Sequence, residues 1–449
     1  MDEDIDVSVA VRQLKEGRSD PSRQVRPLLK LADWHLRKSK ETANGADFTK
    51  ANALYNAALV RSELLNYEVG EDQIIRGIVE TYRTFLSTFT NDEDVGVDEI
   101  RNEIRSHKEF LAKERKIFKD RLEHQYEIHT DMIYDVFRDI QDMYTRLVSM
   151  LVKECEGRLG QPPCDYAMVA MGSVARMEAT PFSDLEFAIL YADPAIGDKI
   201  SYFRVLTHFL HLKVINLGET ILPALGIEQL NDFQSSAPDG SWFYDSDTPP
   251  GISFDGAMPW ASKTPLGRMA TEDKPALELI KTPEDMAELQ DEEISLKEGY
   301  HLADILLRVA LLYGKRALLD EYNERVAEKL NTKSSAAKGN STKTVGFIRG
   351  IQQMILDIET YHPQNCYLGV HCAVGGLFDA KKEFYRLISL LLSDLGLIFD
   401  IRSPSPWRVI MELWTRGIID ETEKNNIKEC LSIANEIRLK AYFAYNRQK

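Results

Sequence analysis

Two carboxylates lie two positions apart in an apolar segment near the middle of the chain, where Asp184 and Glu186 flank Leu185. Because side chains alternate between the two faces of a β-strand, we expect both carboxylates to project from one face while Leu185 and Phe187 enter a core on the other. Neighbouring carboxylates repel each other, and a bound divalent cation relieves that repulsion. The spacing therefore predicts a metal site.

A Gly-Ser turn precedes this pair, with Ser173 eleven residues before Asp184. Gly172 allows the backbone to approach a phosphate, and Ser173 offers its hydroxyl and nearby N–H groups at the start of a short helix. Arg176 contacts either a triphosphate or Glu178, and the sequence favours neither. Displacement at phosphorus requires cations on the attacking and leaving sides, which Mg²⁺ or Mn²⁺ held by carboxylates supplies. The motif predicts nucleotidyl transfer from an NTP.

A third carboxylate is needed to complete such a site. Asp255 is our choice for a metal-binding and catalytic residue, because it ends a short predicted strand and precedes Gly256, which permits close approach. Asp245 and Asp247 are rivals on a Ser/Pro/Asp/Gly-rich loop.

These residues carry a family resemblance. Gly172-Ser173, Ala175-Arg176-x-Glu178 and Ser183-Asp184-Leu185-Glu186 resemble the signature of the polymerase-β-type nucleotidyltransferase superfamily, in the branch of PII-protein uridylyltransferases and related nucleotidyltransferase domains. The resemblance implies a mixed sheet with flanking helices, NTP and Mg²⁺ as substrate and cofactor, and transfer of UMP or AMP to an acceptor. It also implies that one residue of Lys381-Lys382 contacts the nucleotide, for which we take Lys382.

The chain departs from that branch in two respects. Glu186 stands where the uridylyltransferases usually carry Asp, and no HD-type hydrolase motif or pair of regulatory domains follows residue 300. The PII protein is therefore in doubt as the acceptor. Asp304 and Arg308, one helical turn apart, are expected to form an intrahelical ion pair.

The surrounding periodicity predicts an α+β fold, in which a small core with strands lies between an N-terminal helical arm and a C-terminal helical bundle, and the resemblance implies that the sheet of this core is mixed. We place the arm at residues 1–150, the catalytic core at 151–275 and the bundle at 276–449. Within the arm, residues 27–62 resemble one tetratricopeptide unit, and an ordinary helical hairpin is the alternative. In the core we expect strands at 165–171 and 212–216, and in the bundle a continuous helix over 295–326.

Composition narrows the function classes. The 449-residue chain has a formal net charge of −16, which disfavours non-specific binding to nucleic acid or to an anionic membrane. Its five cysteines are scattered without a CxxC arrangement, and its N-terminus is acidic, so we expect reduced thiols in a soluble cytoplasmic protein.

Two other functions remain open at this stage. The chain could be a catalytically silent nucleotide-binding module whose helical arm binds a protein partner, or a synthase of a nucleotide second messenger. The buried acid pair favours catalysis, because burying two neighbouring carboxylates is costly.

Overall fold

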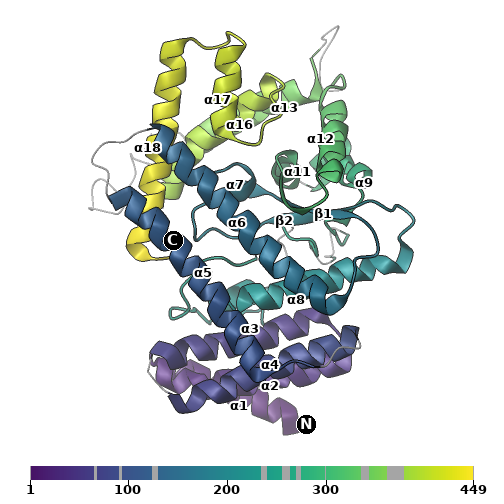
Figure 1. Cartoon of the computed structure of the whole chain (residues 1–449), viewed down its shortest axis with the longest axis vertical. Helices are drawn as coiled ribbons and strands as arrows, with labels where there is room; N and C mark the ends of the chain where they lie inside the picture. The colour runs from purple at the N-terminus through teal and green to yellow at the C-terminus, as the bar shows by residue number, and fades with distance from the viewer. Residues whose placement is uncertain are drawn as a thin grey trace.

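The computed structural model describes residues 2–64, 68–90, 94–123, 130–233, 240–254, 263–268, 270, 275–298, 300–334, 343–361 and 379–447. It confirms the α+β class, with a helical arm, a small mixed sheet and C-terminal helices (Figure 1).

Four helices form the arm, at the purple end of the chain in Figure 1: α1 (Asp2–Glu16), α2 (Pro21–Thr42), α3 (Gly45–Leu64) and α4 (Glu68–Phe89). Helix α3 is buried along almost its whole length, because it packs against α2, α4 and α8 together. Its alanine-rich sequence permits this close packing. Helices α2 and α3 form the expected hairpin, whose likeness to a tetratricopeptide unit stays a prediction.

Three long helices connect the arm to the sheet: α5 (Val97–Glu123), α6 (Thr130–Leu159) and α8 (Ser201–Ile215). The strand expected at 212–216 was wrong, because these residues belong to the end of α8 and the turn after it. Within α8, Lys213 is buried against one carboxylate of α5 and one of α6.

The sheet has the strand order β3-β2-β1-β4, with β1 (Tyr166–Ala170), β2 (Phe187–Tyr191), β3 (Ile280–Lys281) and β4 (Ala310–Gly314). Strand β1 is antiparallel to β2 and β4, whereas β2 and β3 are parallel. Residues on alternate positions of β1 and β2 enter two separate apolar cores, one on each face. Two of the four strands therefore come from residues that follow position 275.

The remaining helices are α7 (Gly172–Ala175), α9 (Pro283–Ala287), α10 (Glu292–Glu298), α11 (Tyr300–Leu307), α12 (Arg316–Leu330), α13 (Val345–Tyr361), α16 (Arg386–Ile398), α17 (Pro406–Thr415) and α18 (Glu421–Tyr445). Among them, α9 and α12 pack against strands of the sheet, whereas α16, α17 and α18 pack against one another. Short turns complete the described structure: η1 (Gly197–Ile200), η2 (Leu222–Leu225), η4 (Glu288–Gln290) and the π-helical turn η5 (Ala380–Tyr385). No helix in the described ranges is long and apolar enough to cross a bilayer.

Candidate functional site

The acid pair lies just before β2, and its two faces are separated as the strand period predicts. Leu185 is 1% exposed and forms a parallel bridge with Phe254, while Asp184 and Glu186 are partly exposed on the opposite side. Phe254 in turn stacks on His211 of α8, with the ring centroids 4.3 Å apart. This aromatic layer fixes the strand, so both carboxylates face the same cavity.

Gly172 places the turn directly against the acid pair. Its φ of 57° lies in the left-handed region, and a Cβ at this position would lie 1.6 Å from Glu186 Oε2. Only glycine satisfies both conditions. The structure thus gives Gly172 a role that the sequence did not show, which is to make room for the Glu186 carboxylate. The approach of a phosphate to Gly172 stays a prediction.

A cavity of about 380 Å³ opens beside this turn. Its volume falls within the range of small-molecule sites. The lining comes from segments far apart in the sequence, between residues 172 and 438. It includes Gly172, Ser173, Arg176, Ser183, Asp184, Glu186, Lys263, Asp304, Arg308, Asp357, Lys381, Arg386, Asp394 and Arg438.

Two lysines lie near the acid pair. Lys263 Nζ is 3.1 Å from Glu186 Oε1, and Ser253 Oγ donates a hydrogen bond of 2.8 Å to Asp184 Oδ1. Burial lowers the pKa of Lys381, against the attraction of Asp184 and Glu186. Both lysines line the cavity, so they are placed to neutralise an anionic ligand beside the carboxylates.

Lys382, the residue expected to contact the nucleotide, lies elsewhere. Its side chain is 68% exposed, its Nζ is 3.7 Å from Asp379 Oδ2, and it is absent from the cavity lining. Lys381 lines the cavity instead, because adjacent residues of a helical turn point in different directions.

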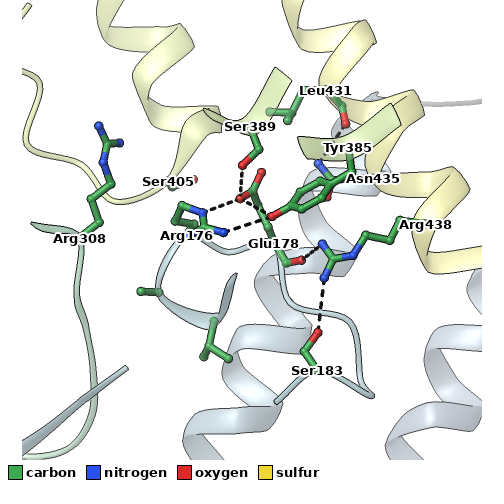
Figure 2. Close-up of polar contacts among 12 residues, drawn as sticks. Arg176, Glu178, Ser183, Arg308, Tyr385, Ser389, Ser405, Leu431, Asn435 and Arg438 are labelled. Carbon is green, nitrogen blue, oxygen red and sulfur yellow. Dashed lines mark hydrogen bonds and ion pairs between the residues drawn. The ribbon is translucent and has the colours of Figure 1, made fainter. Parts of the chain in front are cut away.

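Arg176 makes the ion pair that was one of its two expected roles. Glu178 is fully buried, and its Oε2 accepts hydrogen bonds from Arg176 Nε (2.9 Å), Tyr385 Oη (3.0 Å) and Ser389 Oγ (2.7 Å). Figure 2 shows these three side chains converging on the Glu178 carboxylate from separate elements. Arg176 also lines the cavity, so the ion pair holds its guanidinium at the cavity wall.

Two further arginines were missed as site residues. Arg438 of α18 donates to the Glu178 carbonyl (2.8 Å) and approaches Ser183 Oγ (3.5 Å), and Arg308 donates to the carbonyls of Ser393 and Ser403. Both are less than 9% exposed, and neither forms an ion pair with a carboxylate in the described part of the chain. Arg308 is therefore not paired with Asp304, which binds Arg349 of α13.

Burial lowers the pKa of Arg308 to about 10, and the nearby Arg176 charge contributes. A buried guanidinium without a carboxylate is costly, so both arginines favour an anionic ligand in the cavity.

Residues 121–221 match the family model described as "Putative nucleotidyltransferase DUF294". The matched region contains α6, β1, the Gly172 turn, the acid pair, β2 and α8. It supports a nucleotidyltransferase-type domain in this part of the chain, and hence nucleotidyl transfer in general. A comparison with curated proteins gave no significant match.

The structure does not test the choice of Asp255 as the third carboxylate. Asp255 lies outside the described ranges. Asp245 is buried against Arg61 of α3, with its Oδ1 2.9 Å from Arg61 Nη2, and Asp247 Oδ2 lies 3.2 Å from the same nitrogen. Neither rival lines the cavity, because Arg61 holds both at the junction with the arm.

A separate cluster has ligand types suitable for a metal. Single ligand atoms of Glu103, His107 and Glu154 lie within 4.8 Å of one another. However, Lys213 Nζ is 2.6 Å from Glu103 Oε1 and 3.0 Å from Glu154 Oε2, where a cation would be needed. We therefore interpret the cluster as a buried ion-pair network that joins α5, α6 and α8.

Proposed function

We propose that the chain is a Mg²⁺-dependent nucleotidyltransferase that moves UMP or AMP from an NTP to a hydroxyl of a protein or small-molecule acceptor. One observation carries the proposal: Asp184 and Glu186 face one cavity of nucleotide size together with lysines and with arginines that lack carboxylate partners. The family match at 121–221 supports the same reaction class.

Asp184 and Glu186 would hold the divalent cation, Mg²⁺ or Mn²⁺, because carboxylate oxygens are the ligands these ions prefer. Asp255 remains our proposed third ligand and helper in deprotonating the acceptor. The bound ion would neutralise charge that develops on the transferred phosphoryl group.

The protein's own cations would bind and orient the triphosphate. Lys381, Lys263 and Arg438 line the cavity near the acid pair, and Arg176 is fixed at its wall by Glu178. Ser173 lines the same cavity and adds a hydroxyl beside the Gly172 turn. This arrangement favours transfer over a silent nucleotide-binding role, because holding a nucleotide needs the cations but not two adjacent carboxylates.

Incubation with each of the four NTPs labelled at the α-phosphate, with and without cell extract as a source of acceptor, tests the proposal. We expect Mg²⁺-dependent transfer of label that Asp184→Ala abolishes while the melting temperature stays close to that of the wild type. Asp193→Ala is the matched control, since Asp193 is an exposed carboxylate beyond the other end of β2. Transfer that survives Asp184→Ala contradicts the proposal, and a linked or cyclic product from NTP alone indicates second-messenger synthesis.

A further inference from the structure

The cavity has a second end with a different character. Lysines lie near Asp184 and Glu186, whereas α11, α13 and α16 contribute Asp304, Asp357 and Asp394 to the same lining. Asp304 forms an ion pair with Arg349, which compensates its negative charge. Asp357 and Asp394 have no comparable ion pair within the described ranges, so this end is rich in hydrogen-bond acceptors.

Two carboxyl oxygens at this end have no partner among the described residues. Asp394 is 2% exposed and Asp357 is 6% exposed, and Oδ2 of each accepts no hydrogen bond there. Asp357 Oδ1, by contrast, accepts from Gln353 Nε2 at 3.0 Å. Buried polar atoms in folded proteins almost always have a partner, so two unsatisfied acceptors beside one cavity indicate a ligand that donates hydrogen bonds. The Asp side chain reaches such a ligand by rotation about its soft χ2 torsion.

The two residues are electrostatically coupled. The pKa of Asp394 is raised to about 8, chiefly by burial and secondly by the neighbouring Asp357, against the opposing charge of Arg308. Asp394 is therefore largely a neutral acid at pH 7, which lowers the negative charge of this end without removing its acceptors. A neutral donor group suits it better than a strongly cationic one.

We propose that Asp357 and Asp394 bind the exocyclic amine of the nucleotide base, so that the protein prefers an amine-bearing NTP such as ATP over UTP. The inference rests on the proposed function and narrows its substrate. An amine on adenine, cytosine or guanine carries two hydrogens for the two unsatisfied oxygens. Uracil has one ring N–H on its pairing edge, and would leave one acceptor unsatisfied while placing carbonyl oxygens against Asp357.

Binding measurements on the full chain with Mg²⁺ test the base preference. We expect ATP to bind at least about tenfold more tightly than UTP, and also than purine riboside triphosphate, which is ATP without its amine. Inorganic tripolyphosphate reports on the phosphate end alone. UTP or purine riboside triphosphate binding as tightly as ATP would overturn the inference while leaving the proposed function intact.

Variants locate the effect. Asp357→Asn and Asp394→Leu should each weaken ATP binding by about fivefold or more and leave tripolyphosphate binding unchanged, since removing a hydrogen-bonding partner mainly affects the group it contacts. Asp400→Asn is the control, because Asp400 is exposed just after α16. Equal losses for ATP and tripolyphosphate would count against a base contact. If no NTP and no tripolyphosphate binds the wild type, the proposed function itself fails. The comparison of ATP, UTP and purine riboside triphosphate on the wild type tests the base preference even if a variant does not fold.

Discussion

The buried Glu178 carboxylate provides the sharpest test of how the site is assembled. Arg176 of the turn after α7, Tyr385 of η5 and Ser389 of α16 all donate to the same oxygen, Glu178 Oε2 (Figure 2). The other oxygen, Oε1, has no partner in the described part of the chain. One carboxylate oxygen thus joins the turn that carries the site to the C-terminal helices.

This asymmetry predicts different costs for two substitutions. Glu178→Gln can place its amide oxygen where Oε2 lies and its NH₂ where Oε1 lies, so the three hydrogen bonds persist but lose their charge assistance. Because charge-assisted bonds are roughly twice as strong as neutral ones, we expect a loss of about 1–2 kcal/mol in the free energy of unfolding. Glu178→Ala removes the buried carboxylate and leaves Arg176, whose side chain is 23% exposed, with only its hydrogen bond to Tyr385 Oη. The expected loss is therefore about 3 kcal/mol, the lower end of the range for a broken buried ion pair.

Urea denaturation followed by circular dichroism measures both variants against Glu412→Ala. Glu412 forms an exposed ion pair with Arg416 at 3.0 Å on α17, so its removal should cost no more than about 0.5 kcal/mol. Arg176→Gln, alone and combined with Glu178→Gln, completes a double-mutant cycle in which we expect at least about 1 kcal/mol of coupling. A cost for Glu178→Ala no larger than that for Glu412→Ala would refute the reasoning.

Three other predictions follow from single contacts. Gly172→Ala should abolish transfer and lower the melting temperature more than Gly197→Ala does. Both glycines have a positive φ, but only at Gly172 would a new Cβ collide with Glu186. If the two variants lose the same activity and the same stability, backbone strain alone explains the loss. Lys213→Ala leaves Glu103 and Glu154 without their buried cation, which should lower the free energy of unfolding by about 3–5 kcal/mol. Added Zn²⁺ should then raise the melting temperature of this variant more than that of the wild type, because Glu103, His107 and Glu154 form a set of three ligands. The pKa of Asp394 is raised to about 8 in the folded state, whereas the unfolded state releases the same proton near pH 4. Stability should therefore fall as the pH rises from about 4 to about 8. Asp394→Asn should flatten this part of the plot of melting temperature against pH, and an unchanged slope would contradict the assignment.

The acid pair was predictable from sequence because its geometry depends on local periodicity. Strand alternation alone places Asp184 and Glu186 on one face, and the apolar partners Leu185 and Phe187 make the opposite face unambiguous. The helical arm was confirmed for the same reason, since long periodic segments specify their own element type, whereas the mixed sheet was expected from the family resemblance.

The missed features depend on tertiary contacts. Strand β4 lies inside the helix expected over 295–326, because its apolar residues pair with β1, and a short apolar run alone does not distinguish a strand from a buried helix. Arg308 was assigned to Asp304 by its spacing, but the partner of Asp304 is Arg349, 45 residues away in sequence. The choice between Lys381 and Lys382 depended on the phase of η5, which one sequence does not fix.

The charged residues around the cavity bear on whether it binds an anionic ligand. Ion pairs satisfy Asp245, Asp304 and Lys213, and each pair lies in or beside a helix junction where it contributes to packing. Arg308 and Arg438 are buried as deeply, but their hydrogen bonds in the described structure go to carbonyl and hydroxyl oxygens, and Arg438 also lies over the Tyr385 ring at 4.2 Å. An apolar residue of similar volume would pack there without the desolvation cost of several kcal/mol per ion. An anionic ligand in the cavity would supply the countercharge that both guanidinium groups lack, which supports the proposed function.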